Sequence, residues 1–211
     1  MLITHLGHAC VLVEIDGLRA LIDPGGYSTG FDDLLDLDLI LITHEHEDHF
    51  AMDRLATVLD RNGGVTIISN AAVAAKLPEE GSVLVIEPGE TRNVRGLSIE
   101  ATGAEHAVIH PLVPNVASTG FVLGGRIWHP GDSFAHDARQ VDILLLPVGG
   151  PWMRLQEAID FERSVSPRVA IPIHEAGLSH LHQALHYRLL TALAPEGTSF
   201  VPLERGTATN I

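Results

Sequence analysis

The feature that most constrains this chain is the stretch LILITHEHEDHF at residues 39–50. An apolar run ends abruptly in His44, His46, Asp48 and His49. Two histidines two positions apart at a strand end point the same way, so they can hold one cation together. Asp48 and His49 follow where the chain must already be turning, which suits two neighbouring cations better than one. The pattern therefore predicts a two-metal site rather than a solvated turn.

Further ligands are expected from distant segments, because four side chains cannot complete the coordination of two ions. The candidates are His106 in GAEHAVIH, Asp132 in WHPGDS and His174 in IPIHE. Each follows or ends a predicted strand. Asp132 is the expected bridge, since its two carboxylate oxygens can each hold one ion.

The order of apolar runs predicts an α/β chain with a single domain over residues 1–211. Two halves, each with strands first and helices interleaved later, suggest two packed sheets with helices on the outer faces. Helices are expected at residues 50–61, at AAVAAKL, and at residues 152–164 and 180–193. Strands are expected at LITHL, ACVLVEI, LRALID, LDLILIT, VTIIS, SVLVIE, TRNV, LSIEAT, HAVI, GFVLG, RIWH, VDILLLPV, RVAIPI and SFVPL.

The charge balance limits the partners. Thirteen Lys and Arg against 27 Asp and Glu give a net charge of −14, whereas nucleic acids and anionic membranes reward clustered Lys and Arg. No apolar run approaches the ~20 residues that span a bilayer, and the first residues lack the features of a signal peptide. Cys10, the only cysteine, is expected to be a buried small hydrophobe. We expect a cytoplasmic protein that acts on a small molecule; the oligomeric state is left open.

On these motifs the chain resembles the metallo-β-lactamase-fold hydrolases. THEHEDH matches their HxHxDH signature, and GD at 131–132 and IPIH at 171–174 match the positions of their later metal ligands in order. LIDPGG at 21–26 matches the strand and turn that precede the signature in this family. THLGHACVLVE and WHPGDS are similar to a small bacterial stand-alone branch that is related to sugar-phosphate lactonases. The resemblance implies a four-layer αββα sandwich of two mixed sheets.

The resemblance also implies a ligand set for each ion. The first ion would be held by His44, His46 and His106, and the second by Asp48, His49 and His174, with Asp132 between them. Zinc is the usual occupant in the family, and manganese and iron occur in relatives. The segment AEHAVIH also offers His110; His106 is preferred because it stands where a loop meets a predicted strand, whereas Pro111 holds His110 extended.

Other side chains receive supporting roles. His8 and His180 are candidates for substrate contact at the rim, with an ordinary turn residue as the alternative for His8. Asp23 and His129 are expected to support the ligands from behind, and Trp152 is expected to be a buried aromatic. Packed or solvated positions are expected for His5, His136, His182 and His186.

Together these residues predict a hydrolase in which Asp48 orients a water activated by two metal ions. The target would be an ester, lactone, thioester or phosphodiester. A non-haem iron oxygenase or redox protein with the same ligands is the alternative from another chemical class, and a non-catalytic metal-binding protein is the third. The segments that would shape the substrate site, residues 24–33, 107–119, 149–153 and 175–182, carry no recognition motif.

Overall fold

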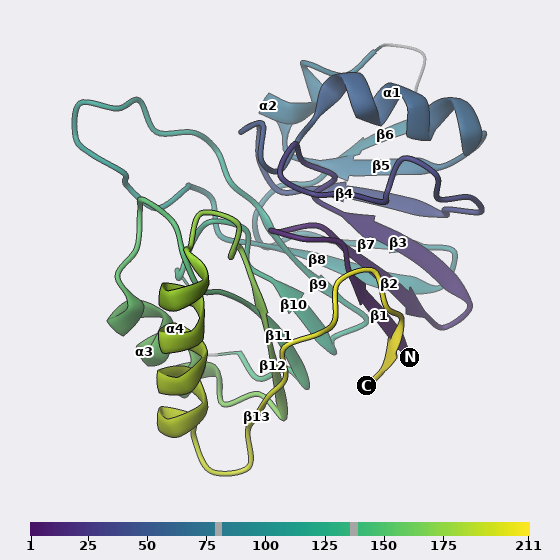
Figure 1. Cartoon of the computed structure of the whole chain (residues 1–211). Coiled ribbons are helices and arrows are strands. Elements are labelled where there is room, and N and C mark those ends of the chain that lie inside the picture. The colour runs from purple at the N-terminus through teal and green to yellow at the C-terminus, as the bar shows by residue number, and fades with distance from the viewer. Residues whose placement is uncertain (79–81, 136–138) are drawn as a thin grey trace.

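The computed structural model describes residues 1–78, 82–135 and 139–211. Within these residues, two seven-stranded sheets pack face to face and helices cover their outer sides (Figure 1). The first sheet contains β1 (Leu2–His5), β2 (Val11–Ile15), β3 (Leu18–Ile22), β4 (Leu39–Ile42), β5 (Thr66–Ser69), β6 (Ser82–Val85) and β14 (Thr209–Asn210). The second contains β7 (Thr91–Val94), β8 (Leu97–Thr102), β9 (Gly120–Leu123), β10 (Ile127–His129), β11 (Ile143–Pro147), β12 (Val169–Ile173) and β13 (Ser199–Phe200). The helices are α1 (Met52–Arg61), α2 (Ala71–Ala74), α3 (Leu155–Val165) and α4 (His180–Leu193).

Both sheets are mixed. The strand orders are β14-β1-β2-β3-β4-β5-β6 and β13-β12-β11-β10-β9-β8-β7. Strands β3 to β6 run parallel, as do β10 to β13, while the hairpin-connected strands are antiparallel. The parallel strand β4 is buried at all four positions, as expected for a strand covered on both faces. The carboxyl ends of such strands share one edge of the sheet, which is where polar side chains can meet.

The alternation of side chains along each strand separates the core into layers. In β4, Leu39 and Leu41 pack between the two sheets, whereas Ile40 and Ile42 pack with α1 side chains such as Leu55 and Val58. The second sheet repeats this arrangement, and its outer face packs against α3 and α4. The expected four-layer αββα sandwich is therefore confirmed.

One local expectation was wrong, and one strand was missed. The run HAVI at residues 106–109 is not a strand; beside it lies only an isolated bridge between Glu105 and Ala117. Val108 and Ile109 are exposed, so no sheet face offers them burial that would favour a strand. The structure also contains β14, which pairs antiparallel with β1 and was not predicted. Among the described helices, none combines the length and the apolar character needed to cross a bilayer.

Candidate metal centre

The first group of candidate ligands lies in the loop that follows β4. This loop carries His44, His46, Asp48 and His49. The turn after β3 braces it, because the Gly26 amide donates to the Glu47 carbonyl at 2.7 Å and the Ala51 amide donates to the Pro24 carbonyl at 3.1 Å. A Cβ atom added at Gly25 would lie 1.7 Å from the carbonyl oxygen of Asp48. Only glycine at this position allows the two loops to approach so closely.

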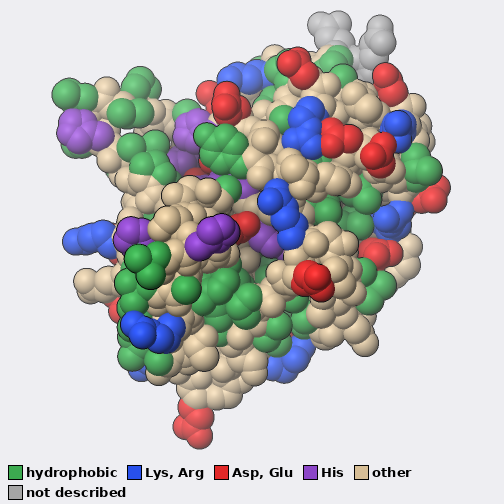
Figure 2. All heavy atoms as spheres, viewed as in Figure 1, with side chains coloured by type: hydrophobic (Ala, Val, Ile, Leu, Met, Phe, Trp, Pro, Cys, Tyr) green, Lys and Arg blue, Asp and Glu red, His purple; other side chains and the backbone are tan. Residues whose placement is uncertain are grey.

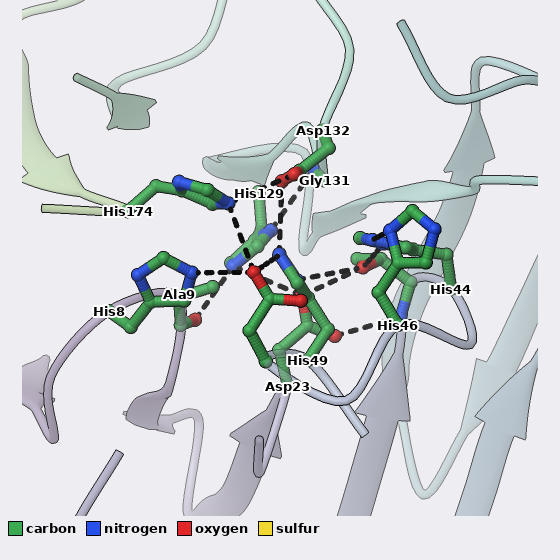
Figure 3. Close-up of polar contacts among 12 residues, drawn as sticks. His8, Ala9, Asp23, His44, His46, His49, His129, Gly131, Asp132 and His174 are labelled. Atoms are coloured by element: carbon green, nitrogen blue, oxygen red, sulfur yellow. Dashed lines mark hydrogen bonds and ion pairs between the residues drawn. The ribbon is translucent and has the colours of Figure 1, made fainter. Parts of the chain in front are cut away.

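The second sheet supplies the other candidates. His106 follows β8, Asp132 follows β10 and His174 follows β12. In the close-up, His174 and Asp132 reach toward His49 from the opposite sheet (Figure 3). The distances from Asp132 carboxylate oxygens to histidine Nε2 atoms are 3.1 Å for His49, 3.3 Å for His106 and 2.9 Å for His174. Asp132 is therefore at the centre of the cluster.

The donor atoms separate into two neighbouring groups that share this carboxylate. One group is formed by His44, His46 and His106, whose ligand atoms all lie within 4.8 Å of one another. The other group, under the same limit, is formed by His8, Asp48, His49 and His174. The structure thus brings together all seven side chains proposed as ligands, in the grouping that the family resemblance implies. Their coordination of metal remains a prediction.

Hydrogen bonds fix one nitrogen of several rings and leave the other free. The Nδ1–H of His49 donates to Asp23 Oδ2 at 2.6 Å, that of His106 donates to the Ala107 carbonyl at 2.5 Å, and that of His174 donates to the Gly149 carbonyl. In each of these three rings the Nε2 atom is then the lone-pair nitrogen.

These lone-pair nitrogens face Asp132 carboxylate oxygens at 2.9–3.3 Å, and an acceptor cannot satisfy another acceptor. Within the described part of the chain, the Nε2 atoms of His49, His106 and His174 and the Oδ1 atom of Asp132 are buried without a hydrogen-bond partner. Buried polar atoms are rarely left unpaired. Four such atoms converging on the same place fit a divalent cation. Because the donors are imidazole nitrogens and carboxylate oxygens, zinc, manganese or iron would suit them.

His44 is fixed in a similar way through Thr43. The Thr43 hydroxyl donates to Asp23 Oδ2 at 2.7 Å, so it accepts from the Nδ1–H of His44 at 2.9 Å. Asp23 is fully buried and orients both His44 and His49, as expected for a supporting residue. Sequence reasoning did not name Thr43, although a hydroxyl directly before the first histidine was a usable signal.

The electrostatics of the site favour a positive charge between its carboxylates. Burial lowers the pKa of His44 well below its usual range. Burial opposes charge on His49 too, but Asp132 and Asp23 outweigh it and raise the pKa of His49 well above its usual range. Burial would raise the pKa of Asp48, whereas its hydrogen bond to His8 and the charge of His49 lower that pKa to about 2. The positive charge can come from a proton on His49 or from a bound cation.

Three residues of the site hold a left-handed backbone. These are His8, Asp23 and His174, with φ values of 51°, 48° and 64°. Non-glycine residues in this region are uncommon and carry strain, which is tolerated where the surrounding structure fixes them. The His174 amide donates to the His8 carbonyl at 2.8 Å. This contact joins the β1–β2 turn of the first sheet to the end of β12 in the second.

His8 lies deeper than the rim position expected for it. Its side chain is 2% exposed, and its Nε2–H donates to Asp48 Oδ2 at 3.0 Å. Its ring centroid lies 3.9 Å from that of His174, and the exposed ring of Tyr27 meets it edge-on. Gly7, directly before His8, has a positive φ. The Gly-His dipeptide was the sequence signal for the tight turn that brings His8 close to Asp48 and His174.

The remaining histidines take varied positions. His110 is exposed on a protruding loop, and His180 is exposed at the start of α4. His129 is fully buried behind the cluster, with its Nε2–H donating to the Ala9 carbonyl (Figure 3). Trp152 is buried, with its ring centroid 6.0 Å from that of His106. His5 is buried, His182 and His186 lie on α4, and His136 lies outside the described residues.

Comparison with known proteins agrees with this fold. Residues 2–174 match the family described as Beta-lactamase superfamily domain. The chain belongs to the β-lactamase superfamily, and its fold is the metallo-β-lactamase fold. Its relation to sugar-phosphate lactonases stays a prediction.

Several relatives cover nearly the same length. Protein Rv0786c of Mycobacterium tuberculosis is 36% identical over 209 residues, which are 97% of this chain and 98% of that protein. The UPF0173 metal-dependent hydrolase MK1542 of Methanopyrus kandleri is 31% identical over 195 residues, 82% of this chain and 84% of its own. The crystal structure of a candidate metal-dependent hydrolase from Parabacteroides distasonis has a TM-score of 0.79 at 26% identity, covering 96% of this chain and 92% of that one.

Proposed function

We propose that this chain is a hydrolase that uses two divalent metal ions against a small ester, lactone, thioester or phosphodiester. The observation that carries the proposal is the convergence on the Asp132 carboxylate of three buried histidine Nε2 atoms that, within the described residues, have no hydrogen-bond partner. Relatives named as metal-dependent hydrolases support the same reaction class. The protein groups that would hold the ions are His44, His46, Asp48, His49, His106, Asp132 and His174.

When bound at this place, divalent ions would lower the pKa of a bound water and polarise the bond that is cleaved. The chain itself orients the attacking water. Asp48 stays ionised at neutral pH, because its pKa is about 2, and its oxygen can accept a hydrogen bond from that water. His8 fixes Asp48 by donating to Oδ2. The reaction adds one water, breaks the C–O, C–S or P–O bond, and leaves an acid and a protonated leaving group.

The substrate is proposed to be a small molecule rather than a nucleic acid. A polyanion needs a track of Lys and Arg along its phosphates, and the net charge of −14 opposes one. Two divalent ions would offset this charge only in part.

The decisive experiment is metal analysis combined with a substrate panel. Protein purified without chelator should contain two divalent ions per chain, zinc foremost, and should hydrolyse members of the panel without consuming oxygen. If the protein contains one ion per chain, and added zinc or manganese does not raise that number, the second site is refuted. Oxygen-dependent turnover with iron would favour the oxygenase, and full metal loading without any turnover would favour a metal-binding protein.

A further inference from the structure

Two exposed apolar segments stand beside the candidate metal centre. The first, here called the apolar tip, comprises residues 107–114. Its Leu112 side chain is 86% exposed, and Val108 and Val113 are also exposed. The second, here called the helix start, comprises residues 180–187, where the Leu181 side chain is 79% exposed. Contiguous exposed apolar patches often mark binding sites.

Each segment follows a histidine that contacts the Asp132 carboxylate. The apolar tip leaves directly from His106, and the helix start follows His174 after a short loop. His106 and His174 both approach Asp132 Oδ2, at 3.3 Å and 2.9 Å. The space-filling view shows a hollow between the protruding tip and the top of α4, with histidine side chains visible in it (Figure 2). A molecule in the hollow that reaches the metal centre would therefore lie between two apolar walls.

The projection of the tip is fixed by its neck. The His106 amide donates to the Val116 carbonyl at 3.0 Å, and the Asn115 side-chain amide donates to the His106 carbonyl at 2.9 Å. Glu105 and Ala117 form a bridge one step further down. The tip therefore stands away from the body of the protein on a paired base (Figure 1), and the fold holds its leucine and valines in water.

The two segments themselves contain no Lys, Arg, Asp or Glu. Lys, Arg, Asp and Glu make up 19% of the chain, yet none occurs in residues 106–119 or 176–187. The next residue of α4, Arg188, lines one surface depression together with Leu181 and Leu185. Apolar walls around a few polar groups are typical of sites that bind apolar ligands.

We propose that the substrate is an ester, thioester or lactone carrying an aliphatic chain, which lies between the apolar tip and the helix start while its carbonyl group reaches the metal centre. This inference rests on the proposed function and narrows its substrate class to acyl compounds with an aliphatic chain. A substrate suits these walls better than a second copy of the protein, because both segments are joined in sequence to His106 and His174 of the candidate metal centre.

The test compares p-nitrophenyl octanoate with p-nitrophenyl acetate on metal-loaded protein. Wild-type kcat/KM should be about tenfold or more higher for the octanoate, because partial burial of six further methylene groups stabilises its bound state. The double variant Leu112→Ser/Leu181→Ser should reduce this ratio to about threefold or less. Leu193→Ser is the matched control, since Leu193 is also exposed but lies at the other end of α4, about 18 Å along the helix. It should keep the wild-type ratio.

A second readout separates this inference from the proposed function. Calorimetric binding of octanamide and acetamide to the metal-loaded protein needs no turnover, and octanamide should bind more tightly in the wild type than in the double variant. Hydrolysis of both esters at equal kcat/KM, with equal binding of both amides, would overturn the inference while leaving the hydrolase intact. Selective octanamide binding without hydrolysis would support the apolar site and overturn the hydrolase. A dimer that the double variant dissociates, with unchanged chain-length preference, would assign the walls to self-association and overturn the inference.

Discussion

Glu162 on α3 provides a sharp test of the energetics of this fold. Its side chain is fully buried, and within the described residues neither carboxylate oxygen has a hydrogen-bond partner. Burial raises the pKa of Glu162 from its ordinary value of 4.5 to about 7, although the charge of Arg163 lowers it in part. The folded protein therefore holds a proton on Glu162 at pH values where the unfolded chain has lost it.

The sign and size of the effect follow from this difference. Below pH 4.5 both states are protonated, so Glu162 has no titration cost. As the pH rises from 4.5 through about 7, the unfolded state releases its proton first and the protein loses stability. A pKa difference of about 2.5 corresponds to a full loss of about 3.4 kcal/mol. Between pH 5 and pH 8 the loss should be about 2.5 kcal/mol.

Glu162→Gln removes the titration while keeping the shape of the side chain. Urea unfolding of both proteins across this pH range should show the variant gaining about 2.5 kcal/mol over the wild type. Any constant cost of burying the amide cancels in this comparison, as do titrations that both proteins share. Parallel stability curves for the two proteins would refute the assignment of a neutral buried carboxyl.

Glu157 on the same helix is a control of opposite sign. Hydrogen bonds from the Arg154 backbone and side chain lower the pKa of Glu157 below its ordinary value. Its contribution to stability is therefore present above its ordinary pKa and is lost as the pH falls. Glu157→Gln should lower stability at neutral pH relative to acid pH, whereas Glu162→Gln raises it.

Three further predictions concern the metal centre. His106→Ala should lose bound metal while His110→Ala keeps it, by elemental analysis, and the reverse result would assign the ligand to His110. Gly25→Ala should lower the free energy of unfolding by about 1–3 kcal/mol through overpacking against the Asp48 carbonyl, and should weaken metal retention. Gly63→Ala, where an added Cβ meets nothing within 4 Å, should do neither. Small esters should be hydrolysed and single-stranded RNA should not; efficient RNA cleavage alone would rule out the small-molecule proposal.

The parts of the fold predicted well from sequence are those where burial dictates the pattern. Strand β4 was recognisable because its residues are apolar on both faces, and its polar continuation marked the site. The segment at residues 106–109 failed because its apolar residues also suggested a strand, although they project into solvent. Strand β14 was missed because two paired residues leave almost no periodic signal.

The sequence predicted which side chains meet at the candidate site better than it predicted the groups that hold them in place. Spacing alone brought His44, His46, Asp48 and His49 together, since all four share one turn. The depth of His8 depends on a left-handed turn and on Asp48 from another loop, which a local pattern does not encode. The same holds for the backbone carbonyl of Gly149, which fixes His174 but carries no side-chain signature at all.

The division of the candidate ligands between the two sheets has a consequence for assembly. One half of the chain offers the HxHxDH loop, and the other offers His106, Asp132 and His174. A bound ion would therefore be a reversible cross-link between segments far apart in sequence. Cross-links that close long loops are expected to stabilise a fold most, because they remove the most conformational freedom from the chain. Each half alone carries only part of the candidate ligand set. A bound ion would then add to the apolar packing between the two sheets, and two separately made fragments should associate more tightly when the ion is present.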